Sequence, residues 1–177
     1  MSRMLVVVDM QNDFIDGALG TPEAQNIVPC VVEKMKDFEA AGDRIVFTMD
    51  THGDHYGDTQ EGRNLPVAHC LKGTKGWEIR DEVKAAVDFE KYKKYEKGAF
   101  GSEKFAMDLA HGTYQNVTEM VFVGVCTDIC VISNAILAKT FLPETKVVVD
   151  ARCCAGVTPQ SHEQALGAMK MCQVDVI

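Results

Sequence analysis

The sequence predicts an α/β protein with three layers, α/β/α, around a mostly parallel and roughly six-stranded central sheet. Short β-branched runs alternate with stretches of helical apolar spacing, and this order produces parallel strands with helices on both faces. Residues 121–125 are apolar without a break, as expected for a strand buried on both faces. The length of 177 residues suits a single domain, 1–177, with one core.

The first half of the chain contains two strands with a helix between them. Residues 4–8 form a β-branched run, and apolar residues from 27 onward recur at helical spacing until Gly42 ends the helix. A second strand, 44–49, ends at Asp50. Residues 51–76 are polar, rich in Gly, His and Asp, and without a period. A loop this long in a compact domain is usually functional or disordered.

The second half continues the alternation. We expect helices at 78–87, 102–111, 128–141 and 158–171, and strands at 88–96, 119–125, 146–150 and 174–177. Thr158-Pro159 is typical of a helix start, because proline suits the first helical position. Ligands of such sheets bind beyond the carboxyl ends of the strands, where Asp9, Asp50 and Cys130 all fall.

Composition and charge exclude several classes of function. The chain is 46% hydrophobic and 25% charged, as folded proteins are, and its net charge of −8 argues against a nucleic-acid binder. No apolar run approaches the roughly 20 residues that cross a bilayer, so we expect no membrane partner. No signal-peptide layout is visible, which predicts a reduced cytoplasm with free thiols. The cysteines expected only to pack are Cys30, Cys153, Cys154 and Cys172.

The turn after strand 119–125 presents a cysteine. Thr127 or Asp128 can cap the following helix, which puts Cys130 in its first turn. Backbone N–H groups and the helix dipole favour negative charge there, so we expect the Cys130 thiol to ionise more readily than a free thiol. The alternative from this stretch alone is that Cys130 is a small buried hydrophobic residue.

Asp9 and Lys97 are the partners that a reactive thiol would need. Asp9 ends a buried strand, where poor solvation raises the pKa of a carboxyl and suits a proton acceptor; capping a loop is the alternative role. Lys97 would favour the ionised forms of a carboxylate and a thiol. Taken alone, Lys97 is one of several lysines on a basic face.

The loop 51–76 offers metal ligands. It contains three of the five histidines, which are His52, His55 and His69. Asp50 and His52 lie at one strand end, and carboxylate with imidazole suits zinc, iron or manganese. Spacing alone leaves metal binding open. The other two histidines, His111 and His162, fall on expected helices away from this loop and should be surface residues.

Three short motifs follow one another along the chain: VVDMQNDF at 7–14, KGAF at 97–100 and GVCTDIC at 124–130. Between them stand Asp50-Thr51-His52 and Pro66-Val67-Ala68-His69, followed by Lys72-Gly73-Thr74. In content and order these motifs resemble the isochorismatase-like cysteine hydrolases, and within them the nicotinamidase, or pyrazinamidase, branch. The resemblance covers nearly the whole chain.

The resemblance implies a set of roles. The catalytic residues would be Asp9, Lys97 and Cys130, with the N–H groups of Cys126 and Cys130 binding an oxyanion and a cis peptide between Val125 and Cys126. A divalent ion, most readily zinc, would be held by Asp50, His52, His69 and a fourth ligand, Glu61 or else His55. Residues contacting the substrate would be Phe14, Phe100 and Leu65. The implied activity is hydrolysis of nicotinamide to nicotinate and ammonia through a cysteine thioester, a step of NAD salvage.

Two other interpretations stay open. The same thiol chemistry can serve another small amide or carbamoyl compound, with the Asp50 loop merely structural. The other interpretation is a non-catalytic ligand-binding domain in which Cys130 is inert. In each interpretation the partner is a small molecule. The short last strand also leaves a sheet edge that a second subunit can complete, so the sequence is compatible with a homo-oligomer.

Overall fold

A parallel sheet organises the molecule. The computed structural model describes residues 2–177, in which six strands lie in the order β3-β2-β1-β4-β5-β6 and every neighbouring pair is parallel. The strands are Arg3–Val8 (β1), Arg44–Asp50 (β2), Lys93–Lys97 (β3), Glu119–Val125 (β4), Lys146–Ala155 (β5) and Asp175–Val176 (β6). The predicted fold class is confirmed.

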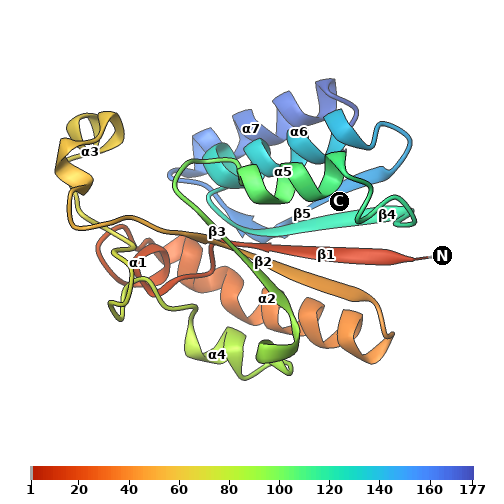
Figure 1. Cartoon of the computed structure of the whole chain (residues 1–177), viewed down its shortest axis with the longest axis horizontal. Coiled ribbons are helices and arrows are strands. Elements are labelled where there is room, and N and C mark those ends of the chain that lie inside the picture. The colour runs from red at the N-terminus through yellow and green to blue at the C-terminus, as the bar shows by residue number, and fades with distance from the viewer. Residues whose placement is uncertain (1) are drawn as a thin grey trace.

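Helices cover both faces of the sheet (Figure 1). One face carries α2 (Pro22–Ala40) and α4 (Asp81–Lys84), and the other carries α5 (Glu103–Ala110), α6 (Ile132–Phe141) and α7 (Pro159–Met171). Shorter pieces are α1 (Asn12–Ile15), α3 (Gln60–Asn64) and the 3₁₀ turns η1 (Tyr56–Asp58) and η2 (Phe89–Lys91). Figure 1 shows α3 projecting from the body beyond the sheet.

Within residues 2–177, every helix is too short or too polar to span a bilayer.

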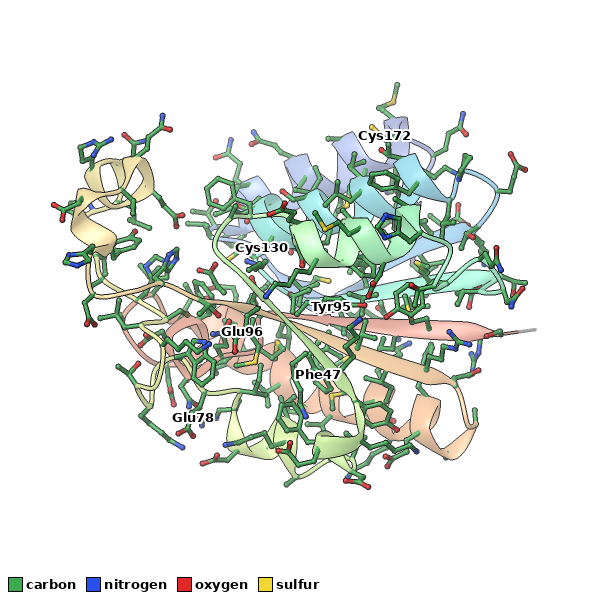
Figure 2. The ribbon with its side chains drawn as sticks, viewed as in Figure 1. Phe47, Glu78, Tyr95, Glu96, Cys130 and Cys172 are labelled. Atoms are coloured by element: carbon green, nitrogen blue, oxygen red, sulfur yellow. A yellow bond between two sulfur atoms is a disulfide. The ribbon has the colours of Figure 1, made fainter. Side chains whose placement is uncertain are left out.

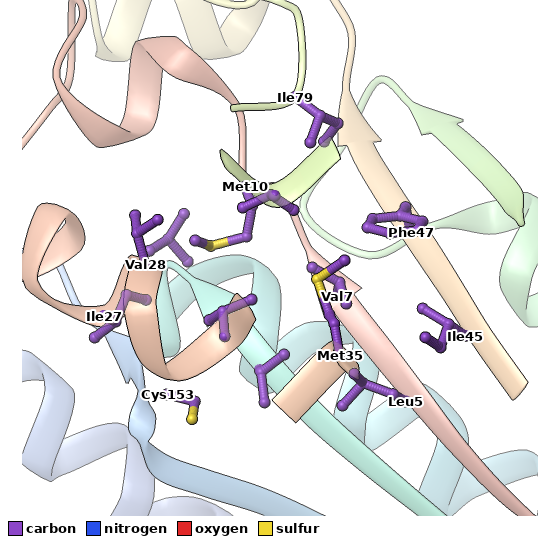
Figure 3. Close-up of a cluster of buried hydrophobic side chains, with 14 of the residues drawn as sticks. Leu5, Val7, Met10, Ile27, Val28, Met35, Ile45, Phe47, Ile79 and Cys153 are labelled. Carbon is purple, nitrogen blue, oxygen red and sulfur yellow. The ribbon is translucent and has the colours of Figure 1, made fainter. Parts of the chain in front are cut away.

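Alternate side chains of the strands point to opposite faces of the sheet and enter two hydrophobic cores. Leu5 and Val7 of β1 face α2, whereas Met4, Val6 and Val8 face the layer of α5, α6 and α7. All five are fully buried. Figure 3 shows the first core, with Leu5 and Val7 beside Met35 of α2. Because full burial of such a side chain contributes about 1.5–3 kcal/mol, these two cores hold the helices on the sheet and fix where the strands end.

Several elements differ in extent from the prediction. Helix α2 begins at Pro22, not near residue 27, because the Thr21 hydroxyl accepts a hydrogen bond from the N–H of Ala24 at 3.0 Å and so starts the helix earlier. The helix expected at 78–87 is one turn, α4, whose buried residue is Val83. The strand expected at 88–96 is shorter, because η2 occupies its first half.

Strand β5 runs to Ala155 instead of ending at Asp150. Its register against β4 shifts after Phe122, and pairing resumes between Cys154 and Gly124. Such a bulge inserts extra residues and lets the strand continue. The sequence signal stopped at Asp150 because charged residues interrupt the apolar run there.

Two cysteines expected to be free thiols are bonded to each other. Cys30 of α2 and Cys153 of β5 form a disulfide, with their Cα atoms 5.4 Å apart. The prediction was wrong because the fold brings together positions 123 residues apart, which no local pattern reveals. The free cysteines among residues 2–177 are Cys70, Cys126, Cys130, Cys154 and Cys172. Cys154 is buried as expected, but Cys172 is exposed just past the C-terminal end of α7 (Figure 2).

Candidate active site

The carboxyl ends of three strands and one turn meet at a single edge of the sheet. Asp9 follows β1, Asp50 pairs in register with Lys97 at the ends of β2 and β3, and Cys130 lies just after β4. Figure 2 shows Cys130 at this edge, below the helices of one layer. Gly124, with a φ of 116°, lets β4 approach β1 here, because any side chain would collide with the Val8 carbonyl.

The Lys97 ammonium lies at the centre of the group. Its Nζ is 2.7 Å from Asp9 Oδ2, 3.4 Å from Cys130 Sγ and 3.2 Å from Asp50 Oδ1. Asp9 is fully buried, and Lys97 and Cys130 are nearly so. The fold therefore brings three residues from distant parts of the sequence into direct contact.

Asp9 is fixed through one of its two oxygens. The Thr48 hydroxyl donates to Oδ1 at 2.6 Å. Oδ2 contacts Lys97, but no donor among residues 2–177 makes a well-aligned hydrogen bond to it. Burial raises the pKa of Asp9; the charge of Lys97 opposes this effect and that of Asp50 reinforces it. Oδ2 is thus a buried oxygen able to take a proton.

The thiol of Cys130 is not the readily ionised group that the sequence predicts. Burial raises its pKa well above the ordinary value, Asp9 raises it further, and Lys97 works in the opposite direction. The prediction was wrong because desolvation outweighs the helix N-terminus. Burial also disfavours the charge on Lys97, but Asp9, Cys130 and Asp50 together raise the pKa of the amine. The surroundings therefore favour the charged form of the Lys97 amine and disfavour ionisation of the Cys130 thiol.

Cys130 stands on a wide turn. Thr127–Val131 (η3) is π-helical, with the carbonyl of Cys126 accepting hydrogen bonds from the N–H groups of Ile129 at 3.1 Å and Val131 at 3.0 Å. The side chains of Thr127 and Asp128, expected to cap the helix, bond to the segment around α7 instead. The peptide between Val125 and Cys126 is cis.

Four possible metal ligands gather beside the triad of Asp9, Lys97 and Cys130. One ligand atom from each of Asp50, His52, Glu61 and His69 lies within 4.8 Å of all the others. Asp50 Oδ2 is 3.0 Å from Nε2 of His52 and 3.4 Å from Nε2 of His69. Burial would raise the pKa of Asp50, but bonds to both imidazoles and the charge of Lys97 hold it well below its usual range. Two imidazoles and two carboxylates form a donor set that suits zinc, iron or manganese.

Neighbouring groups orient these ligands. The side chain of Gln11 holds the main chain of Asp50, accepting from its N–H at 2.7 Å and donating to its carbonyl at 2.8 Å. Nδ1 of His69 lies 2.8 Å from the carbonyl of Val67, which leaves Nε2 for a ligand bond when Nδ1 donates. The Tyr56 ring packs edge-on to the imidazoles of His52 and His69.

The alternative fourth ligand lies outside the cluster. The His55 side chain is 93% exposed and faces Asp58 at 3.7 Å. Glu61, on the projecting helix α3, reaches back to within 3.7 Å of both imidazoles. The geometry thus favours Glu61.

A cavity of about 320 Å³ opens onto both groups, within the roughly 300–1,000 Å³ usual for small-molecule sites. Its walls include the three residues expected to contact substrate, which are Phe14, Leu65 and Phe100, together with Cys126 and Cys130. The ring of Phe14 packs against His69 with centroids 5.5 Å apart. Leu65 and Phe100 are 38% and 50% exposed, which places them at the mouth.

Two supporting residues were missed from the sequence. Thr48 holds Asp9, and its signal was a single hydroxyl inside an apolar strand. Asn134 is fully buried in α6, where its amide donates to the carbonyls of Cys130 at 2.8 Å and Phe100 at 3.2 Å while its oxygen accepts from the N–H of Ser102 at 2.9 Å. Its signal was one amide within an apolar helical run.

The chain is similar to known proteins over nearly its whole length. The isochorismatase domain model matches residues 3–177. The nicotinamidase/pyrazinamidase of Mycobacterium tuberculosis is 29% identical over 99% of this chain and 98% of its own. The crystal structure of the nicotinamidase PncA from Bacillus subtilis has 28% identity and a TM-score of 0.84, with 99% of each chain covered.

Two further solved structures bear on the metal and the substrate. The pyrazinamidase of Pyrococcus horikoshii in complex with zinc is 27% identical, with a TM-score of 0.80 over 100% of this chain and 99% of that one. The N-carbamoylsarcosine amidase of Thermoplasma acidophilum is 28% identical, with a TM-score of 0.79 over 99% of this chain and 95% of that one. The same fold therefore serves more than one small amide.

Proposed function

Because this chain belongs to the isochorismatase family, we propose that it is an amidohydrolase that converts nicotinamide to nicotinate and ammonia. The observation that carries the proposal is the contact of Lys97 Nζ with Asp9 Oδ2 and Cys130 Sγ, at 2.7 and 3.4 Å. Cys130 lies in the wall of a cavity that is also lined by Asp50, Glu61 and His69, three of the four possible metal ligands. Nicotinate formation would serve pyridine nucleotide salvage.

The first half of the reaction forms a thioester. Oδ2 of Asp9 takes the Cys130 proton as the amide binds, and the thiolate attacks the carboxamide carbon. The negative charge is on the Asp9 carboxylate before the proton transfer and on the Cys130 sulfur after it. The charged ammonium of Lys97 contacts both groups and stabilises the charge in either place. The N–H groups of Cys126 and Cys130 stabilise the tetrahedral oxyanion, at about 3 kcal/mol per donor in comparable sites.

The second half releases the products. The protonated Asp9 gives its proton to the departing nitrogen, so that ammonia leaves and the acyl group stays on Cys130. Asp9, again a carboxylate, then removes a proton from the water that attacks the thioester. Collapse of this second intermediate breaks the carbon–sulfur bond, releases nicotinate and returns the proton to the thiol.

A divalent ion, with zinc as our first choice and iron or manganese as alternatives, fits Asp50, His52, Glu61 and His69. When bound, such an ion supplies a Lewis acid for the pyridine nitrogen of the substrate. Its ligands adjoin the triad through Asp50, whose Oδ1 contacts Lys97. The protein's own contribution is to hold the ring between Phe14 and the cavity mouth, with the carboxamide turned toward Cys130.

A second candidate is another small amide or an N-carbamoyl compound. The likeness to an N-carbamoylsarcosine amidase favours it, as does the aliphatic Leu65 in the region where nicotinamidases often place an aromatic side chain. The thiol chemistry would be unchanged.

The test is an ammonia-release assay over nicotinamide, pyrazinamide, benzamide and N-carbamoylsarcosine, with and without a chelator. We expect turnover of the first two and loss of that turnover with the chelator. Benzamide lacks the ring nitrogen and should react poorly, which separates ring-nitrogen recognition from general amidase activity. Preferred turnover of N-carbamoylsarcosine would instead establish the second candidate, and no turnover of any amide would reject both.

A further inference from the structure

A hydrogen bond from α7 holds the turn that carries the nucleophile. Nδ1 of His162 lies 2.8 Å from the hydroxyl of Thr127, and Thr127 is fully buried. One residue further on, both carboxylate oxygens of Asp128 accept from the N–H of Val157, at 3.1 and 3.2 Å. His162 was expected on the surface, but it is half-buried and faces the turn.

His162 stands on a well-fixed helix start. Thr158 and Ser161 form a reciprocal capping box, and Pro159 occupies the first helical position. The N–H of His162 donates to the carbonyl of Thr158 at 3.0 Å. The backbone of Gly156 packs so closely against His162 that a side chain at 156 would overlap it. The backbone from which the imidazole projects is therefore held firmly at the start of α7.

Thr127 lies between the two residues whose placement matters most for the proposed chemistry, so a small rotation of its backbone would move both. It follows Cys126, whose N–H is one proposed oxyanion donor, and it precedes Cys130 by three residues. The turn is wide, and the carbonyl of Cys126 is shared between two N–H groups. The side chains of Thr127 and Asp128 both bond to the segment around α7, so that segment anchors the start of the turn from outside it.

We propose that His162 is a positioning residue for the thiol chemistry: through Thr127 it fixes the Cys126 peptide and the place of the Cys130 sulfur relative to Lys97. The proposal rests on the proposed function for its kinetic consequence but not for its structural one. Misplacement of a reacting atom by about 1 Å can cost on the order of 100-fold in rate. The effect should therefore fall on kcat, since His162 is outside the set of residues that hold the ring.

The kinetic test compares His162→Phe, which keeps a ring without nitrogen, with His162→Asn, whose amide can place a polar atom near the former Nδ1. We expect kcat to fall about tenfold in the first, with KM little changed, and to recover largely in the second. Thr127→Val should resemble His162→Phe, and the double variant should be no worse than either, because both remove one bond. His111→Phe, at an exposed histidine just past the end of α5, is the matched control and should keep wild-type kcat.

Hydrogen exchange tests the same bond without any substrate. In His162→Phe the amides of residues 127–131 should exchange faster, while those of β1 should not change. Wild-type kcat in His162→Phe together with unchanged exchange would overturn the inference, as would equal losses in the Phe and Asn variants. A wild-type protein that hydrolyses no amide would reject the proposed function instead, and the exchange result would still decide the role of His162.

Discussion

The ammonium of Lys97 lies 3.2 Å from Oδ1 of Asp50, so the carboxylate whose other oxygen faces His52 and His69 also faces the amine beside the thiol. The candidate metal cluster and the candidate triad are therefore joined through one buried pair. A substitution in the metal cluster should therefore alter the electrostatics of the triad, and a substitution in the triad should alter those of the metal cluster.

Lys97→Met should lower kcat/KM by at least about 100-fold, the scale of losing one preorganised electrostatic contact in an enzyme site. The neutral side chain leaves Asp9 and Asp50 facing each other without a cation, which raises the pKa of Asp9 because the charge of Lys97 normally lowers it. Steady-state ammonia release measures the loss. Lys97→Arg keeps the charge and should retain more activity than Met; equal activity in the two variants would contradict an electrostatic role.

Cys130→Ala should abolish amide hydrolysis, by roughly 10⁴-fold or more, because no other nucleophile replaces the thiol. The fold should persist, as judged by circular dichroism and melting temperature. Cys126→Ala is the matched control in the same cavity. Only its backbone N–H is used in the mechanism, so activity should stay close to wild type, and a loss equal to that of Cys130→Ala would refute the assignment of the nucleophile.

Purified protein should contain about one divalent ion per chain, measured by plasma mass spectrometry, if the four ligands bind as one site. His52→Ala should lose both the ion and the activity, since it removes a ligand within 3.0 Å of Asp50. His55→Ala should keep both, because its side chain is exposed and outside the cluster. Ion loss in the His55 variant would restore His55 as the fourth ligand.

Thr48→Val should move the acid limb of the kcat/KM profile to higher pH. The Thr48 hydroxyl donates to the Asp9 carboxylate and thereby lowers its pKa. Removing this donor raises the pKa of Asp9, so the carboxylate needed as proton acceptor is lost at a higher pH than in the wild type. Thr48→Ser retains the donor and should titrate like the wild type. An unmoved acid limb in Thr48→Val would show that Asp9 does not set it.

In denaturant without reductant, five thiols should react with Ellman's reagent, and seven after reduction, because Cys30 and Cys153 are bonded. The bond closes a loop of 123 residues, so its loss should destabilise the protein by about 4–5 kcal/mol in the chain-entropy model. Urea unfolding of Cys153→Ser measures this. Cys172→Ser, at an exposed position, should unfold like the wild type. Seven reactive thiols before reduction would mean that the bond does not form.

Strand ends were the part of the site that local pattern could predict. Asp9, Asp50 and Cys130 each follow or end an apolar run, and a parallel sheet brings such ends to one edge. Lys97 could not be found in this way, because its strand is short and lies among other lysines. Its charge made it a candidate partner for the thiol, and only the resemblance of its motif distinguished it from the other lysines.

The features that the sequence predicted wrongly share a physical cause, because each depends on residues that are distant in the sequence. Thr127 was expected to cap a helix because it lies between a strand and a run of helical apolar spacing. In the fold its hydroxyl instead bonds to His162, which is 35 residues further along the chain. The pKa of Cys130 depends on burial by elements far along the chain. The Cys30–Cys153 bond likewise exists only once α2 lies on β5.

The amide of Asn134 joins the turn after β4 to the segment that follows β3. It binds the carbonyl of Cys130 on one side, and the carbonyl of Phe100 and the N–H of Ser102 on the other. All three partners are main-chain groups, so these bonds depend on the path of the backbone at 100–102 and 130, whatever side chains those positions carry. A chimera that exchanges 97–102 can keep the bonds if its backbone follows the same path, whereas loss of the Asn134 amide would release both segments at once.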